Sequence, residues 1–337
     1  MTSLSGITPS GRLTLGNHLG ALRRFTDPDG FYFVANLHAM TTKHDPRRLA
    51  ALTREFATLM LAAGVPDGTV FIQSDVPAHA QLAYLLECTS YVGELSRMIQ
   101  YKEKGNGRPM TRASLFTYPC LMAADILLYG AEQVPVGGDQ DQHVELARDI
   151  AIRFNREYGE TFVVPQLAKA VLATRVKDLA NPTTKMSKSD VDNAVGTIRL
   201  LDPPDVIRRQ IMRAVTDSEN EVRHDEAAKP GVTNLLEILA ACTDGDPIQL
   251  AKAYSSYGSL KQDVADAVLA VIEPLQKEYA RLATDPGAID DLLAQGRDRA
   301  IEASRPRFEA AVRAMGLAGS SATGSGSTAD GLAGSAP

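Results

Sequence analysis

The chain has 337 residues, of which 44% are hydrophobic and 23% are charged, a balance that suits a soluble globular core of one large domain or two ordinary ones. The formal net charge of −6 argues against non-specific coating of nucleic acid, although a local basic face could still dock one structured RNA. Because no apolar run has membrane-spanning length and no signal-peptide pattern opens the sequence, we expect a cytoplasmic protein without membrane contact.

The first stretch combines a short strand with a glycine-rich helix start. Residues 4–7 form the strand candidate, residues 8–11 a Pro/Gly turn, and residues 14–20 begin a helix with Gly16 and Asn17. This is the order of parts in a nucleotide-binding βα unit, in which helix N–H groups and small residues let phosphate come close. Many helix caps carry Gly and Asn for conformational reasons alone, so this segment by itself leaves both interpretations open.

Strand and helix patterns then alternate. Apolar runs at residues 31–36 and 69–73 predict buried parallel strands. Between them Asp45 begins a helix that ends at Gly64, and a further helix is expected over residues 78–91. This βαβ spacing predicts an α/β fold with a doubly wound, Rossmann-like parallel sheet, and ligands at the carboxyl ends of its strands.

Two polar side chains stand in apolar surroundings. His38 lies just beyond the strand at residues 31–36, where a lone histidine is more often a satisfied core residue than a ligand contact. Asp125 lies within an apolar helix expected over residues 116–129. A buried carboxylate is unfavourable unless donors face it, so Asp125 is either paired within the protein or kept for a ligand.

Polar segments flank this helix on both sides. A charged helix over residues 93–106 runs into the loop 104–108, which fits a surface connection better than a phosphate cradle when it is considered alone. After a short strand at 134–137, residues 138–146 form a polar turn into a helix. Their spacing matches no established zinc pattern, so we expect amides that bind a ligand here and no protein-bound metal.

The word Lys185-Met186-Ser187-Lys188-Ser189 predicts a mobile cationic loop, since turn-forming residues flank it. Lysine is a compact charge on a flexible stem, so it can follow phosphate oxygens as they move during a transfer, while hydroxyl and backbone N–H groups add donors. The loop therefore indicates a polyphosphate site, with a solvated surface loop as the alternative.

From Asp202 onward helical patterns replace the alternation. We expect a Rossmann-like catalytic domain with a helical insertion at residues 1–201 and a helical region at 202–317. Residues 318–337 are mostly Gly, Ser, Ala and Thr with little to bury, which predicts a disordered tail. The outward arginines of the helical region indicate a solvated face, with RNA contact as the alternative: Arg208, Arg209 and Arg213.

Seven separate stretches resemble one family, the bacterial tryptophanyl-tRNA synthetases, in order and at matching spacing over roughly residues 3–317. They are residues 14–17, 74–77, 93–104, 118–129, 134–149, 185–189 and 214–218. The lysine motif at residues 185–189 also resembles the ATP-binding signature of class I aminoacyl-tRNA synthetases. The resemblance implies a tryptophan–tRNA ligase that activates L-tryptophan with ATP, releases pyrophosphate and passes tryptophan to tRNA(Trp). It further implies a homodimer and Mg²⁺ as an accompanying ion.

The resemblance also assigns residues to the site. It implies that the triphosphate is held by three catalytic lysines: Lys185, Lys188 and Lys104. It implies an ATP site made of Thr8, Ser10, Gly16, Asn17, Gly137, Asp139, Lys185, Met186, Ser187, Lys188 and Ser189. It implies an amino-acid site made of Leu4, His38, Tyr118, Met122, Asp125 and Gln140. Tyr118 and Gln140 would lie near the amino group and Asp125 would face the indole N–H, an acceptor that rejects a ring lacking that donor.

Four positions depart from the family pattern. The expected glutamine, aromatic, acidic and tyrosine-like residues are replaced at Thr8, Leu4, Gly138 and His18, respectively. These departures are either neutral repacking or the mark of a variant pocket that keeps tryptophan and rejects a tryptophan-mimic inhibitor.

Two other functions remain open on the sequence. A tyrosyl-tRNA synthetase would share the fold and the lysine loop, and a non-catalytic paralogue would bind tryptophan or RNA. Met122 and Asp125 within the helix of Tyr118 argue for tryptophan, and the intact loop 185–189 argues for catalysis.

Overall fold

The computed structural model describes residues 3–105, 108–135, 141–168, 176–186 and 195–317. Seven positions named above lie outside the described residues, as does the tail at 318–337: Gly137, Gly138, Asp139, Gln140, Ser187, Lys188 and Ser189.

The central sheet consists of three parallel strands in the order β1-β2-β3. The strands are β1 (Leu4–Ile7), β2 (Phe31–Val34) and β3 (Val70–Ile72). A second parallel pair, which the sequence predicted only in its first member, joins β4 (Gln133–Pro135) to β5 (Gln166–Ala168).

Successive side chains of the central sheet enter two different apolar clusters. In β2, Phe31 and Phe33 join one cluster, while Tyr32 and Val34 join the other. The neighbouring strand β3 alternates in the same way. Because side chains alternate between the faces of a strand, both faces of the sheet are buried, as the fold class predicted from sequence requires.

Helices supply the other apolar side chains of the two clusters that cover the central sheet. The helices of this part are α1 (Leu15–Gly20), α2 (Asn36–Ala39), α3 (Pro46–Ala62), α4 (Ala78–Glu87), α5 (Val92–Leu95), α6 (Ile99–Lys104), α7 (Ala113–Tyr129) and α8 (Asp141–Tyr158), with short 3-10 helices at Leu22–Arg24 and Gln73–Asp75. Helix α3 starts as predicted, because Asp45 accepts a hydrogen bond from the Arg48 N–H at 2.7 Å and Pro46 takes the first helical position.

Two helices differ from the sequence prediction. Helix α4 ends at Glu87 instead of Tyr91, because the hydroxyls of Thr89 and Ser90 donate to the Leu86 carbonyl at 3.0 and 2.8 Å.

The charged helix expected over residues 93–106 is interrupted between α5 and α6. Gln142 of α8 accepts a hydrogen bond from the Ile99 N–H at 3.0 Å and donates to the Arg97 carbonyl at 3.3 Å. A side chain from another element thereby satisfies the backbone groups that a continuous helix would have paired.

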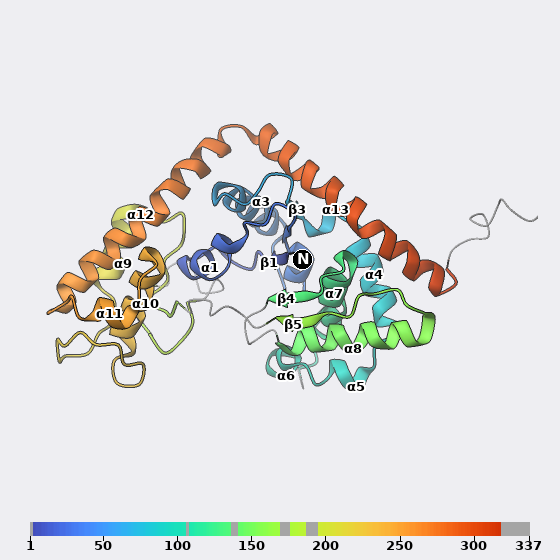
Figure 1. Cartoon of the computed structure of the whole chain (residues 1–337), viewed down its shortest axis with the longest axis horizontal. Helices are drawn as coiled ribbons and strands as arrows, with labels where there is room; N and C mark the ends of the chain where they lie inside the picture. Colours follow the sequence, from blue (N-terminus) through green and yellow to red (C-terminus); the bar gives the residue numbers. More distant parts are fainter. Residues whose placement is uncertain (1–2, 106–107, 136–140, 169–175, 187–194, 318–337) are drawn as a thin grey trace, which may run out of the picture.

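The second half of the chain is helical, as predicted. Its helices are α9 (Pro204–Met212), α10 (Pro230–Thr243), α11 (Pro247–Ala251), α12 (Tyr257–Ala283) and α13 (Pro286–Ala314). Helix α12 packs against α9, α10 and α3, and α13 then runs back over the sheet-containing part, so the two long helices meet in an inverted V (Figure 1). Among the described helices, none is both long and apolar enough to span a bilayer.

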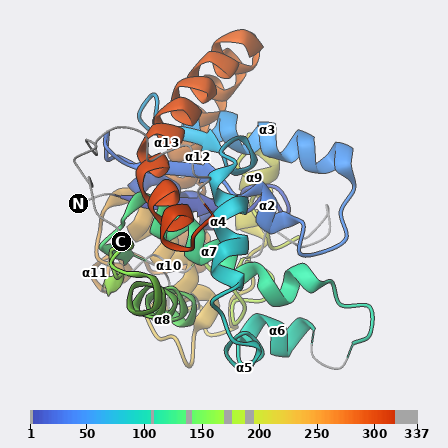
Figure 2. The same cartoon turned by 90° about the vertical axis from the view of Figure 1, so that its right-hand side faces the viewer.

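Helix α13 covers the exposed edge of the sheet. It packs against β3, α7 and α4, on the side of the molecule away from α5 and α6 (Figure 2). The contact is so close that a Cβ atom on Gly296 would lie 1.9 Å from the Val70 carbonyl oxygen. Nearby, the Arg299 guanidinium donates to the Gly30 carbonyl at 3.0 Å and lies 4.6 Å from the ring centre of Phe31. Covering an edge strand in this way prevents it from pairing with another chain.

We predict that Gly296→Ala destabilises the protein by about 1–3 kcal/mol, since either α13 or β3 must shift to admit one methyl group. The matched control is Gly287→Ala on the same helix, where the nearest atom to the new Cβ lies at 3.4 Å. That change should be neutral or stabilising by up to about 1 kcal/mol, as alanine favours helix. Thermal unfolding of both variants measures the difference, and equal unfolding temperatures would refute the close contact.

Candidate functional site

The carboxylate of Asp125, on α7, is almost fully buried at 4% exposure and is surrounded by donors. His38 Nε2 lies 2.8 Å from Oδ2, while Gln73 Nε2 and His79 Nδ1 lie 2.8 and 2.6 Å from Oδ1. The three donors come from α2, from the turn after β3 and from α4. Of the two alternatives for Asp125, pairing within the protein is the one that the structure shows.

Two hydrogen bonds orient the ring of His79. Since an ionised carboxylate only accepts, Nδ1 of His79 carries the proton that it donates to Asp125. Its Nε2 lies 2.8 Å from the Tyr129 hydroxyl, and burial together with the Asp125 charge raises the pKa of Tyr129, so this phenol stays neutral. The rings of Phe33 and Phe71 pack against His79 at 5.6 and 5.9 Å between centres, so the ring that donates to the Asp125 carboxylate lies in apolar surroundings.

Asp125 stays ionised in spite of its surroundings. Burial alone would raise its pKa, but the hydrogen bonds and charge interactions of His38 and His79 outweigh burial and lower the pKa to about 2. The site therefore presents a permanent hydrogen-bond acceptor at every physiological pH.

Tyr118 and Met122 lie on the same helix, about two turns and one turn before Asp125, respectively. The Tyr118 hydroxyl forms a hydrogen bond with His143 Nε2 of α8, and its ring meets the His38 ring edge-on at 6.2 Å between centres. Burial raises the pKa of Tyr118 to about 12, so the phenol stays neutral. Met122 is half-buried against the same apolar cluster as Leu4 of β1.

The glycine-containing stretch at residues 14–17 lies beside Met186 of the lysine motif. A Cβ atom on Gly16 of α1 would lie 3.4 Å from Cβ of Val176 and 3.9 Å from Cβ of Met186. The Asn17 side chain is turned inward, where its Oδ1 accepts from the Thr14 N–H and hydroxyl, both at 3.1 Å. Two stretches 170 positions apart, Gly16 and Met186, are thus neighbours in space.

A short antiparallel stem carries Lys185. Lys177 and Lys185 form a bridge, the Met186 N–H donates to the Val176 carbonyl at 3.1 Å, and the Asp178 N–H donates to the Thr184 carbonyl at 2.9 Å. Met186 is buried and Lys185 is exposed, so this stem, residues 176–178 and 184–186, directs a lysine toward solvent beside α1.

The structure thus brings the predicted residues into two groups. His38, Tyr118 and Asp125 meet in one, and Gly16, Met186 and Lys185 meet in the other. Lys104 is exposed in the last turn of α6, and within the described chain its side chain bonds to neither group. Thr8 and Ser10 follow β1, where the Ser10 N–H donates to the Thr8 carbonyl at 2.9 Å.

Sequence reasoning missed Gln73, His79, Tyr129 and His143, which hold the residues it named. The only signal was indirect, because a carboxylate in an apolar helix demands donors from elsewhere. His79 lies 46 positions before Asp125, and no local pattern pairs them.

Comparison with known proteins defines the class. The family described as tRNA synthetases class I (W and Y) matches residues 1–273. The chain therefore belongs to the class I tRNA synthetases of the tryptophan and tyrosine group. Among its relatives, tryptophan–tRNA ligase 1 of Streptomyces avermitilis is 52% identical, with 93% of this chain and 98% of the relative covered. Tryptophan–tRNA ligase of Oceanobacillus iheyensis is 45% identical, with 94% and 98% covered.

Solved structures agree. Tryptophanyl-tRNA synthetase from Mycoplasma pneumoniae superposes with a TM-score of 0.85 at 34% identity, covering 94% of this chain and 98% of that one. The Campylobacter jejuni enzyme complexed with ADP and tryptophan gives a TM-score of 0.78 at 31% identity, covering 94% and 100%. Within this class of aminoacyl-tRNA synthetases, the chain is a member of the bacterial tryptophanyl-tRNA synthetases. Tyrosyl-tRNA synthetase from Aeropyrum pernix, at 21% identity, shares the fold alone, so the tyrosine alternative is not favoured.

Proposed function

We propose that the two groups of residues form one active site, in which L-tryptophan is activated by ATP and then passed to tRNA(Trp). The observation that carries the amino-acid assignment is the buried, ionised Asp125 on the same helix as Tyr118 and Met122, with His38 in contact with both Asp125 and Tyr118. Family membership supports the reaction, and the bound tryptophan and ADP in the Campylobacter jejuni structure support the two ligands.

The indole N–H fits the remaining acceptor capacity of Asp125. A carboxylate has about four lone-pair positions, and His38, Gln73 and His79 use three of them. An indole N–H would fill the fourth or displace His38, which is the donor on the less crowded oxygen. Phenylalanine has no donor there and would leave the acceptor desolvated and unpaired, so selection needs no editing step.

The chemistry requires no side-chain nucleophile. The tryptophan carboxylate oxygen attacks the α-phosphorus of ATP in line, the bond to the bridging oxygen breaks, and pyrophosphate leaves with the electron pair. A terminal ribose hydroxyl of the tRNA then attacks the acyl carbon, AMP leaves, and the proton passes to solvent. The protein contributes alignment and charge.

The neutral Tyr118 hydroxyl and Gln140 would orient the amino group. On the ATP side, Lys185 and Lys188, with Lys104, would stabilise the charge that develops on the leaving phosphates. The backbone near Gly16 would approach the nucleotide, together with the remaining predicted ATP contacts: Thr8, Ser10, Asn17, Gly137, Asp139, Met186, Ser187 and Ser189.

Mg²⁺ would enter with ATP. Among the described residues no cluster of three or more His, Cys, Asp or Glu side chains could hold a metal. Mg²⁺ commonly keeps its waters and binds phosphate oxygens, so a dedicated protein cage is unnecessary.

We further propose a cytoplasmic homodimer in which residues 1–201 catalyse the reaction and residues 202–317 contact tRNA. Large apolar side chains at the junction of α4 and α5 face solvent and suit a second copy: Tyr84 at 66%, Tyr91 at 55% and Val92 at 72% exposure. Light scattering of the purified protein would measure the oligomeric state. In the helical region Arg208 and Arg209 pair with Asp266 and Asp205, at 2.6 and 2.8 Å, which leaves exposed Arg213 as the stronger candidate for RNA contact.

Among the four departures from the family pattern, Leu4 and His18 have described surroundings. Leu4 packs in the same cluster as α7, so a smaller side chain there would alter the amino-acid pocket. His18 is different. It is buried on α1, burial and then Arg23 lower its pKa to about 4, and among the described residues its Nδ1 has no hydrogen-bond partner.

Asp125→Asn should abolish discrimination between tryptophan and phenylalanine while ATP binding stays near normal. The amide can present an N–H to the indole, and losing a hydrogen bond to a charged group costs about 1.5–3 kcal/mol, or roughly 10- to 100-fold. Amino-acid-dependent ATP–pyrophosphate exchange measures both substrates. Retained preference for tryptophan would disprove the indole assignment.

Lys188→Ala should lower the rate of activation far more than the affinity for tryptophan, because the lysine acts on charge that develops during the transfer. The protein contains no tryptophan, so the change in ligand fluorescence on binding reports affinity without a contribution from protein tryptophan. A mutant with unchanged exchange rate and unchanged affinity would contradict the role of the lysine.

Restoring the common residues with Thr8→Gln and Gly138→Glu should increase inhibition by tryptophan mimics and leave the Michaelis constant for tryptophan nearly unchanged. Each regained polar contact to a mimic is worth about 1–3 kcal/mol, whereas tryptophan retains Asp125 and Tyr118. If inhibition and the Michaelis constant move together, or neither moves, the proposal of resistance to tryptophan mimics fails and an ordinary synthetase remains.

A further inference from the structure

The Asn234 side chain of α10 forms hydrogen bonds with the backbone of the stem that carries Lys185. Its Oδ1 accepts from the Lys177 N–H at 2.9 Å, and its Nδ2 donates to the Lys177 carbonyl at 3.0 Å. One amide thus pairs with both backbone groups of a single residue, as a neighbouring strand would. Asn234 is 1% exposed and stands among the apolar residues of α10, where an unpaired amide would be strongly unfavourable.

The contact between Asn234 and Lys177 lies directly across the stem from Lys185. Lys177 is the residue bridged to Lys185 across the stem. The Lys177 ammonium pairs with Glu226 at 2.6 Å, and directly after the first strand of the stem the Val215 N–H donates to the Leu179 carbonyl at 2.8 Å. The stem is therefore fastened to the helical part of the chain by several independent bonds.

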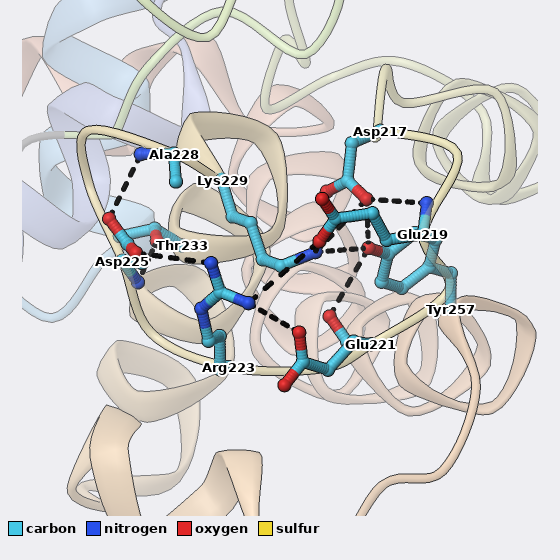
Figure 3. Close-up of polar contacts among 9 residues, drawn as sticks. All are labelled: Asp217, Glu219, Glu221, Arg223, Asp225, Ala228, Lys229, Thr233 and Tyr257. Atoms are coloured by element: carbon cyan, nitrogen blue, oxygen red, sulfur yellow. Dashed lines mark hydrogen bonds and ion pairs between the residues drawn. The ribbon is translucent and has the colours of Figure 1, made fainter.

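The start of α10 is itself rigidly held. Lys229 is buried at 1% exposure, and its ammonium lies 3.0 Å from Asp217, 2.7 Å from Glu219 and 3.1 Å from the Tyr257 hydroxyl. Figure 3 shows these groups converging from the loop before α10 and from the start of α12. A buried cation with three partners strongly opposes displacement, since any shift would leave a charge unpaired.

The residue next to Asn234 points to a different partner. Thr233 is fully buried, and its hydroxyl accepts from the Asp225 N–H at 2.9 Å (Figure 3). Two adjacent polar residues of one helix thus hold two different segments: Thr233 holds the loop before α10, and Asn234 holds the stem.

We propose that Asn234 is a positioning residue for the activation step, which sets the place of Lys185 by holding the backbone of Lys177. The helical part of the chain would then control the ATP side of the active site, while the tryptophan side depends on α7 and the central sheet. This inference rests on the proposed function, because it assumes that Lys185 acts on ATP.

Asn234→Ala should lower kcat/KM for ATP in tryptophan-dependent pyrophosphate exchange by about 10- to 100-fold, the effect of misplacing a catalytic group by roughly 1 Å. The dissociation constant for tryptophan, read from ligand fluorescence, should change less than about 2-fold. Thr233→Val is the matched control: it removes one buried hydrogen bond from the same helix and should leave both constants within about 2-fold.

A double-mutant cycle with Lys185→Ala separates positioning from general destabilisation. If Asn234 acts through Lys185, its loss should add less than about 3-fold in the Lys185→Ala background. Unfolding temperatures establish that each variant folds, and if Asn234→Ala does not, Asn234→Asp, which keeps the acceptor for the Lys177 N–H, takes its place in the same cycle.

The proposal fails if a folded Asn234 variant has the wild-type kcat/KM for ATP, if ATP and tryptophan constants worsen in parallel, or if the two substitutions multiply in full. Failure of the proposed function is distinct, because the wild-type protein would then show no tryptophan-dependent exchange at all.

Discussion

A single buried charge organises the amino-acid half of this molecule. Asp125 could not remain ionised inside α7 without donors, and those donors come from α2, from the turn after β3 and from α4. The carboxylate therefore determines where four segments lie relative to one another. Removing any donor would leave a buried charge partly unpaired, which is more unfavourable than the loss of an ordinary surface contact.

The lysine stem depends on a different part of the chain. Its contacts run to α1 through Gly16 and to α10 through Asn234. The two substrates would thus be served by separate structural supports that meet at the active site. In such an arrangement changes in the helical part can alter ATP use without disturbing the recognition of the amino acid.

Much of the fold could be predicted because it is encoded locally. The strands β1 to β3 are short apolar runs, and α3 carries its own start signals in Asp45 and Pro46. The remaining features depend on contacts distant in sequence. Gln142 interrupts the helix at residues 96–98 from another element, and Gln73, predicted as the last residue of a strand, lies in the turn after β3 and donates to Asp125. The predicted substrate residues His38, Tyr118 and Asp125 do lie together. No local sequence pattern, however, indicated that His79 and Tyr129 support Asp125.

The close packing of Gly296 on Val70 has a consequence for how the chain is made. The two residues are 226 positions apart. At a synthesis rate of about 5–20 residues per second, β3 would wait roughly 11–45 s for the helix that covers it. During that interval the edge of β3 would remain uncovered. Such an edge can pair with other nascent chains, so the yield of native protein should be governed by how quickly the last long helix is delivered and docks.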